Sequence, residues 1–271
     1  LDINLQLSPS PPETAQGLID GRADVSFGGP MRVLMHHDKD KDCPLMCFGQ
    51  VVARDPFILV GQIPNPNFHF KDLIGPKIGI AIDVPTPWMT LQDDLSRAGI
   101  NPISINRGGD AMMKENTTFF KNGELDVVQV FEPYAQELIE AGGHIWHRFS
   151  TRGDIAFTTF YATRGFIDEN RSACRALINA MNKSLTKIHN STAKEISDAI
   201  RPMYFPNLSS SSFENIITQY KKARLWPKTT ALPASSFVRL KASLLSGALI
   251  EKDIPYHLII DQTLSQPGAV S

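Results

Sequence analysis

Two hydrophobic periodicities divide the chain into predicted strands and helices. Apolar residues that alternate with polar ones, or that follow one another without a break, predict strands. These segments are 3–7, 23–27, 45–53, 57–62, 77–82, 103–105, 125–131, 145–149 and 155–162. Apolar residues at helical spacing predict helices over about 12–20, 31–36, 86–98, 111–122 and 133–141, a single turn at 70–74, and three further helices after residue 172. Strands and helices therefore alternate in the first 160 residues or so, as in an α/β protein.

A strand–helix–strand unit occurs twice. The first copy runs from Ile3-Asn4-Leu5 through a helix to Gly21-Arg22-Ala23-Asp24-Val25 and ends at Gly28-Gly29-Pro30. The second runs from Ile103-Ser104-Ile105 through a helix to Gly123-Glu124-Leu125-Asp126-Val127 and ends at Phe131-Glu132-Pro133. Gly-x-x-Asp is also a common joint between a helix and a strand, but the matching order of elements favours a duplication. The sequence therefore predicts two α/β lobes of similar plan.

The two copies differ in what precedes them. A strand and a helix, over residues 77–100, stand before the second copy, whereas residue 1 falls at the corresponding place of the first. The comparison predicts that one N-terminal strand–helix unit of roughly 25–35 residues is missing from this sequence.

Composition excludes several classes of protein. The 271 residues carry a formal net charge of −1, which argues against nucleic-acid binding because such proteins usually show a basic stripe. No apolar run approaches the roughly 20 residues that span a membrane. The 3 cysteines form no disulfide framework, and Cys43 and Cys47, about 13 Å apart in an extended segment, are too distant to bridge.

Three segments carry a resemblance to a known family. They are Gly21-Arg22-Ala23-Asp24-Val25-Ser26-Phe27-Gly28-Gly29-Pro30, Phe70-Lys71-Asp72-Leu73-Ile74-Gly75-Pro76-Lys77-Ile78-Gly79 and Glu124-Leu125-Asp126-Val127-Val128-Gln129-Val130-Phe131-Glu132-Pro133-Tyr134. Their order and spacing resemble the periplasmic solute-binding proteins of ABC importers for nitrate, sulfonates, taurine and thiamine-precursor pyrimidines. The resemblance covers essentially the whole chain.

The resemblance implies a two-lobed, type II periplasmic-binding-protein-like fold with two crossover hinge strands, here 54–62 and 155–162. Residues 1–60 and 157–271 would form lobe 1, which includes the C-terminal helices, and residues 61–156 would form lobe 2. The family pattern also begins with a strand and a helix ahead of residue 1.

The function that this resemblance implies is that of the solute-binding component of an ABC import system. Such a protein captures a small polar molecule, anionic or heteroaromatic, between its lobes and delivers it to a membrane permease. We expect a monomer, periplasmic or membrane-tethered outside the cytoplasm, with no catalytic residue, no cofactor and no nucleic-acid partner.

Two alternatives stay open. The first is an enzyme on the same fold, such as a pyrimidine-precursor synthase or a menaquinone-pathway enzyme. The synthases resemble this chain but carry a dense cysteine cluster. The segment Cys43-Pro44-Leu45-Met46-Cys47 matches that cluster poorly. The second is the ligand-sensing domain of a regulator, although the sequence contains no helix-turn-helix segment.

Ligands of such folds bind at the carboxyl ends of parallel strands, where helices begin. Gly28, Gly29 and Pro30 occupy such a place, and backbone N–H groups at a positive helix end suit an anion, although a plain tight turn explains these residues equally well. In the second lobe, Thr86 either caps the next helix or bonds the ligand. Trp88 forms either a stacking wall or part of the core.

Five further residues complete the candidate ligand set, namely Phe131, Glu132, Tyr161, Arg54 and Arg107. Glu132, after Phe131, either accepts a hydrogen bond from a ligand amine, pairs with an arginine of the other lobe, or serves the start of its helix. Tyr161 is the residue of the return crossover that we expect to contact the ligand. Arg54 and Arg107 either bind an anion through two parallel hydrogen bonds or are simply solvated.

Metal binding is not expected. His36-His37 reads as an exposed helix end, Cys43 and Cys47 lack further ligands at zinc spacing, and residues 38–42 lack the glycine and terminal glutamate of a calcium loop.

Overall fold

A computed structural model describes residues 1–8 and 13–265. Its contacts divide the chain into two compact units. Unit 1 comprises Leu1–Arg54, Asp154–Ile196 and Arg224–Ser271, and unit 2 comprises Asp55–Gly153 and Ser197–Ala223. The chain thus passes from unit 1 to unit 2 after Arg54 and returns after Gly153.

Unit 1 is built on an antiparallel sheet in the order β1-β8-β2. These strands are β1 (Ser26–Gly28), β2 (Leu45–Val52) and β8 (Thr158–Thr163). The helices around this sheet are α1 (Glu13–Ile19), α2 (Met31–Lys39), α6 (Arg164–Glu169), α7 (Arg171–Asn190), α10 (Ala234–Ser246), α11 (Tyr256–Ile259) and α12 (Gln262–Ser265).

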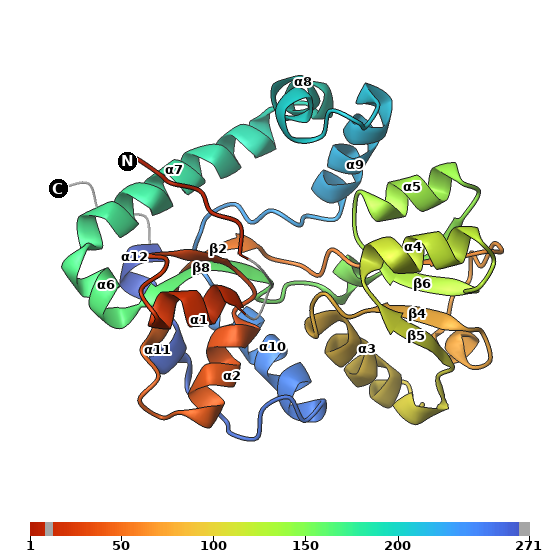
Figure 1. Ribbon diagram of the computed structural model, residues 1–271, viewed down its shortest axis with the longest axis horizontal. Coiled ribbons are helices and arrows are strands. Elements are labelled where there is room, and N and C mark those ends of the chain that lie inside the picture. Colours follow the sequence, from red (N-terminus) through yellow and green to blue (C-terminus); the bar gives the residue numbers. More distant parts are fainter. Residues whose placement is uncertain (9–12, 266–271) are drawn as a thin grey trace. The chain divides into compact units, whose positions relative to one another are not determined.

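The side-chain alternation of β2 and β8 divides the unit 1 core between the two faces of this sheet. Leu45 and Cys47 of β2 and Tyr161 of β8 pack with α1, α2, α10 and α11. Met46 of β2 and Ala162 of β8 pack on the other face, with α6, α7 and α12 (Figure 1). Segments from both ends of the sequence therefore share the cores of unit 1.

Unit 2 holds a five-stranded mixed sheet in the order β5-β4-β6-β3-β7. Its strands are β3 (Ile58–Gly61), β4 (Ile78–Ala81), β5 (Arg107–Ala111), β6 (Val127–Val130) and β7 (His144–Arg148). The residues of β3, β4 and β6 are all buried, as expected for central strands. Figure 1 shows α4 (Met113–Lys121) and α5 (Tyr134–Glu140) on one face of this sheet and α3 (Thr86–Arg97) on the other.

Short and bridging helices complete the architecture. Unit 2 also contains the 3-10 turns η1 (Phe70–Leu73), η2 (Pro102–Ser104) and η3 (Phe149–Arg152), and the helix α9 (Ser210–Lys222). Helix α8 (Ala193–Tyr204) carries the chain from unit 1 into unit 2.

The two sheets repeat one plan. In unit 1 the sequence β1-α2-β2 leaves a gap that β8 fills, antiparallel to both strands. In unit 2 the sequence β6-α5-β7 leaves a gap that β3 fills, again antiparallel to both. Each inserted strand follows one of the two passages of the chain between the units. This repeat in topology shares only β1 and β6 with the strands of the repeat predicted from the sequence.

The predicted strand over residues 3–7 is wrong. Residues 1–8 belong to no strand, and Ile3, Leu5 and Leu7 are 63%, 81% and 94% exposed. Alternation creates a buried face only where a neighbouring strand supplies hydrogen bonds, and none does so among the described residues. Pro12, expected in the first turn of the next helix, lies outside the described residues.

The predicted strand over 103–105 is also wrong. Asn101 accepts a hydrogen bond from the Ile103 backbone N–H (3.1 Å), and Pro102 begins the turn η2. An asparagine cap followed by proline favours such a helical turn. The strand is β5 instead, which pairs in parallel with β4. Its sequence Arg-Gly-Gly-Asp-Ala has almost no apolar residues, so hydrophobicity could not reveal it.

The C-terminal helices divide differently from the expected lobe boundaries. Residues 157–271 were all expected in lobe 1, whereas Ser197–Ala223 cluster with unit 2. Polar contacts join α9 to α5 within unit 2. Ser212 donates to Glu140 (2.5 Å), and Asn215 donates to Gln136 (2.6 Å).

Candidate functional site

The loop between β1 and α2 lies where the sequence predicts it. Gly28 ends β1, Gly29 follows, and Pro30 is the residue before α2, which begins without a side-chain cap. An uncapped helix start offers its positive end to a ligand or to water. Anion binding at this loop stays a prediction.

A buried arginine lies against this loop. Arg32, in the first turn of α2, is only 9% exposed. Its Nη1 atom is 3.4 Å from the position that a Cβ would take on Gly28, and equally far from that on Gly29. Sequence analysis missed Arg32. Its position two residues after Pro30, on the helix that the predicted loop begins, could have pointed to it.

The Arg32 guanidinium bonds one hydroxyl group. Its hydrogen-bonding partner is the Tyr161 hydroxyl, which also lies 2.8 Å from Thr14 Oγ1. Ser26 Oγ donates to the Thr14 carbonyl (2.8 Å). Burial lowers the pKa of Arg32 and raises that of Tyr161. Tyr161 itself is fully buried, and its hydroxyl is engaged by Thr14 and Arg32.

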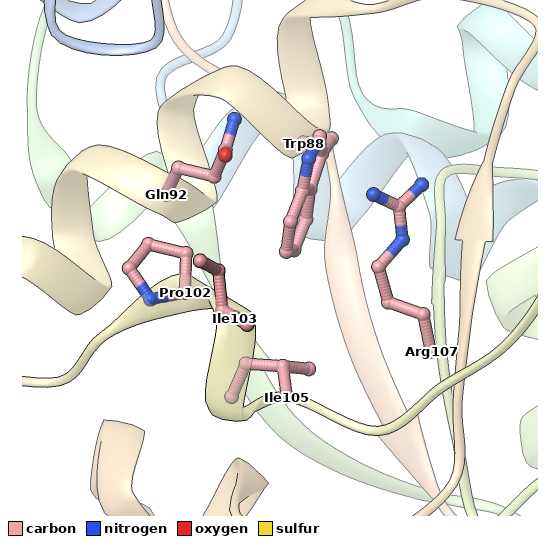
Figure 2. Close-up of a pocket in the computed structure, with 6 residues that line it drawn as sticks. All are labelled: Trp88, Gln92, Pro102, Ile103, Ile105 and Arg107. Carbon is pink, nitrogen blue, oxygen red and sulfur yellow. The ribbon is translucent and has the colours of Figure 1, made fainter.

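In unit 2, Trp88 and Arg107 meet at a cavity of about 230 Å³. The Arg107 guanidinium lies 4.4 Å from the centre of the Trp88 ring, a cation–π contact. Figure 2 shows the two side chains facing each other, with Gln92, Pro102, Ile103 and Ile105 completing the wall. A second cavity of about 200 Å³ shares both residues. Arg107 also forms an ion pair with Asp110, so its charge is already partly satisfied.

Thr86 begins α3, whose preceding residue, Pro85, makes no side-chain cap. Thr86 is buried, and its carbonyl accepts a hydrogen bond from Thr90 Oγ1 (3.1 Å). Thr90 Oγ1 also lies 3.3 Å from the Asp55 carboxylate. The start of α3 is therefore tied to the residue at which the chain enters unit 2.

Phe131 and Glu132 follow β6. The Phe131 ring meets Phe57 edge-on at 5.1 Å. Glu132 is buried and accepts a hydrogen bond from the Gln136 backbone N–H (2.8 Å), so its carboxylate serves the first turn of α5. Its own backbone N–H donates to the Tyr220 hydroxyl (3.2 Å). Burial raises the pKa of Glu132, and the nearby Arg148 opposes that rise.

The raised pKa of Glu132 predicts a pH-dependent contribution to stability. The folded chain holds this proton more tightly than the unfolded chain, whose glutamate pKa is about 4.3. The contribution is therefore complete below that pH and is lost as the pH rises through the higher, folded pKa. We expect Glu132→Gln to lose less stability than wild type between pH 4 and pH 8, measured by urea unfolding at each pH. Parallel pH profiles for the two proteins would contradict this assignment.

Arg54 is the last residue before the chain leaves unit 1, and Asp154 is the first residue after the chain returns to it. The two side chains form an ion pair (2.7 Å). In unit 2 the next residue, Asp55, pairs with Arg152 (2.7 Å). Arg152 also bonds Asp94 through Nε (3.1 Å). The structure thus gives the Arg54 candidate a carboxylate partner, and it reveals a buried charge network at Asp55 that sequence analysis did not find.

The cysteines show no sign of a nucleophile. Cys43, Cys47 and Cys174 are free and buried. Burial raises the pKa of all three thiols, that of Cys47 to about 12, whereas a reactive cysteine needs a lowered pKa. Within residues 1–8 and 13–265, no group of three or more His, Cys, Asp or Glu residues could hold a metal ion. No helix in the same ranges is long and apolar enough to cross a membrane.

In each sheet, one inserted strand, β8 or β3, pairs antiparallel with the strands on both sides of it, and helices begin where strands end. These features define a protein of the type II periplasmic-binding-protein-like fold. The profile of the NMT1/THI5-like family matches residues 1–194. The chain belongs to this family.

Relatives agree with this placement. A protein of Bacillus subtilis (strain 168), named as a binding protein, YtlA, is 23% identical over 98% of this chain and 80% of its own length. The structure of the periplasmic aliphatic sulphonate binding protein SsuA from Escherichia coli superposes with a TM-score of 0.75 at 16% identity, over 95% of this chain and 86% of SsuA. The predicted fold and the predicted solute-binding family are confirmed.

An enzyme shares the same fold. The complex of the desulfurization enzyme DszB with biphenyl-2-sulfinic acid superposes with a TM-score of 0.60 at 15% identity, over 95% of this chain and 94% of DszB. The fold alone therefore does not separate a binding protein from an enzyme.

Proposed function

We propose that this protein is the solute-binding component of an ABC import system and that it captures a small polar molecule. Family membership over residues 1–194 carries the proposal. It is supported by the name of the YtlA relative and by the likeness to SsuA, which binds aliphatic sulphonates. The protein would act outside the cytoplasm, periplasmic or membrane-tethered, as a monomer that hands its solute to a permease.

The proposed ligand contacts begin with the two uncapped helix starts. In unit 1 they are Gly28, Gly29 and Pro30, with Tyr161 beside them. In unit 2 they are Thr86 and the cavity residues Trp88 and Arg107. Phe131, Glu132 and Arg54 complete the proposed set, and each has a structural partner as well.

A thermal-shift screen tests the proposal. We expect at least one compound among nitrate, alkanesulfonates, taurine, pyrimidines and aromatic acids to stabilise the protein, because a ligand at 100 times its Kd adds about 2.7 kcal/mol. For a chain of this size that corresponds to a rise in Tm of roughly 5–11 °C. Sodium chloride at matched ionic strength is the control. If no compound shifts Tm beyond that control, the proposal is wrong.

Recovery of the bound compound separates binding from catalysis. A binding protein returns its ligand chemically unchanged after prolonged incubation, and mass spectrometry of the released compound measures this. Conversion of the compound would favour an enzyme, for which the buried cysteines provide no nucleophile.

A further inference from the structure

We propose that Arg32 is an anion-recognition residue, and that it takes the singly charged oxyanion group, carboxylate or sulfonate, of a small solute. This inference rests on the proposed function, since it names the chemical class of the solute. The Arg32 guanidinium has no counter-ion among the described residues.

Arg32 is buried without a carboxylate partner. It is 9% exposed, and the interactions that set its pKa involve burial and the Tyr161 hydroxyl alone. No ion pair to Arg32 occurs among the described residues. By contrast, Arg152 of unit 2, whose side chain is 12% exposed, is neutralised by the two carboxylates of Asp55 and Asp94. Buried charges in proteins are normally paired, so the Arg32 site is one in which an anion from outside the chain would complete the pairing.

The groups around Arg32 suit an oxyanion. A guanidinium has five N–H donors in a fixed fork, of which the Tyr161 hydroxyl can engage only a part. The start of α2, which has no side-chain cap, adds positive potential near the residues of its first turn. A Cβ on Gly28 or on Gly29 would lie 3.4 Å from Arg32 Nη1, so the two glycines let the guanidinium lie close to the loop backbone.

The charge count limits the class of anion. One guanidinium contributes a single positive charge, and its partner Tyr161 is a neutral hydroxyl that lies 2.8 Å from that of Thr14. A monoanion leaves this site neutral, whereas a dianion such as hydrogen phosphate leaves a buried negative charge uncompensated. Carboxylates and sulfonates both accept two parallel hydrogen bonds from a guanidinium.

Calorimetric titration of the whole chain with sodium ethanesulfonate, sodium propionate and sodium phosphate tests the inference. We expect the wild type to bind one or both monoanions and to bind phosphate more weakly. Arg32→Gln should weaken the monoanion about 10- to 100-fold, the effect of losing a charged hydrogen-bonding pair. Arg32→Lys should recover only part of the affinity, because an ammonium lacks the fork. Arg239→Gln, at an exposed position of α10, should bind as the wild type does.

A second readout is independent of the ligand. Without added anion, Arg32→Gln should be as stable as the wild type or more stable, because it removes an unpaired buried charge. A marked loss of Tm in this variant would instead indicate a structural role and overturn the inference.

Three binding results would also overturn it. They are the absence of binding of both monoanions to the wild type, equal affinity in Arg32→Gln, and a preference for phosphate. A neutral or cationic solute that stabilises wild type and Arg32→Gln alike would refute this inference and leave the proposed function standing. Failure of every solute in the thermal-shift screen would refute the proposed function itself.

Discussion

Replacing Arg152 by alanine is expected to destabilise unit 2 by about 3–5 kcal/mol, the usual cost of removing one member of a buried charge network. Asp55 is completely buried, and it would lose its only cationic partner among the described residues. Asp94 would lose the same partner. The Phe57 backbone N–H (2.9 Å) and Thr90 would remain near Asp55, but neither neutralises its charge.

The measurement is equilibrium urea unfolding followed by tryptophan fluorescence. Trp88 and Trp146 lie in unit 2 and Trp226 in unit 1, so a Trp226→Phe background reports on unit 2. Arg97→Ala is the matched control. Arg97 pairs with Asp93 on the surface of α3, and its side chain is 70% exposed, so its loss should cost no more than about 0.5 kcal/mol. Equal losses of unfolding free energy in the two variants would show that the buried network stabilises unit 2 no more than a surface ion pair does.

Phe237→Ala is expected to cost about 3–5 kcal/mol of the stability of unit 1. Phe237 is fully buried in α10 and meets the Tyr256 ring edge-on at 5.3 Å. It packs in the same cluster as Ala15 of α1 and Val33 of α2. The cavity would therefore open where the beginning and the end of the chain share a core.

Val238→Ala is the control for this prediction, because Val238 is the next residue of α10 and is 54% exposed. Its replacement should change stability by about 0.5 kcal/mol or less. Urea unfolding monitored by Trp226 fluorescence, in a Trp88→Phe/Trp146→Phe background, reports on unit 1. A small effect of Phe237→Ala would mean that α10 is not an integral part of that core.

Much of the fold followed from local patterns. The buried strands β2, β3, β4 and β6 were predicted because their apolar residues are dense, and helices such as α3, α4 and α5 because their apolar faces repeat at helical spacing. Two predictions of strands were wrong, for opposite reasons. Residues 3–7 have a strand pattern without a neighbouring strand, and β5 has a neighbouring strand without an apolar pattern.

The candidate site was predicted only in outline. Trp88 and Arg107 were each chosen separately, and their contact follows from the packing of α3 beside β5. Tyr161 was chosen as a residue facing a ligand, whereas the fold buries its ring and leaves its hydroxyl with Thr14 and Arg32. Arg32 looked like any other helical arginine, because nothing local distinguishes a buried guanidinium from a solvated one.

By itself the sequence determined the α/β class and the glycine loop before α2, since each depends on periodicity or on a short motif. Only the tertiary structure decided which charges are buried and which partners they have. Arg54 acquires Asp154, Arg152 acquires two aspartates, and Arg32 acquires only a hydroxyl. Burial and pairing depend on segments far apart in the sequence, and the free energy of a charge depends on its surroundings more than on its residue type.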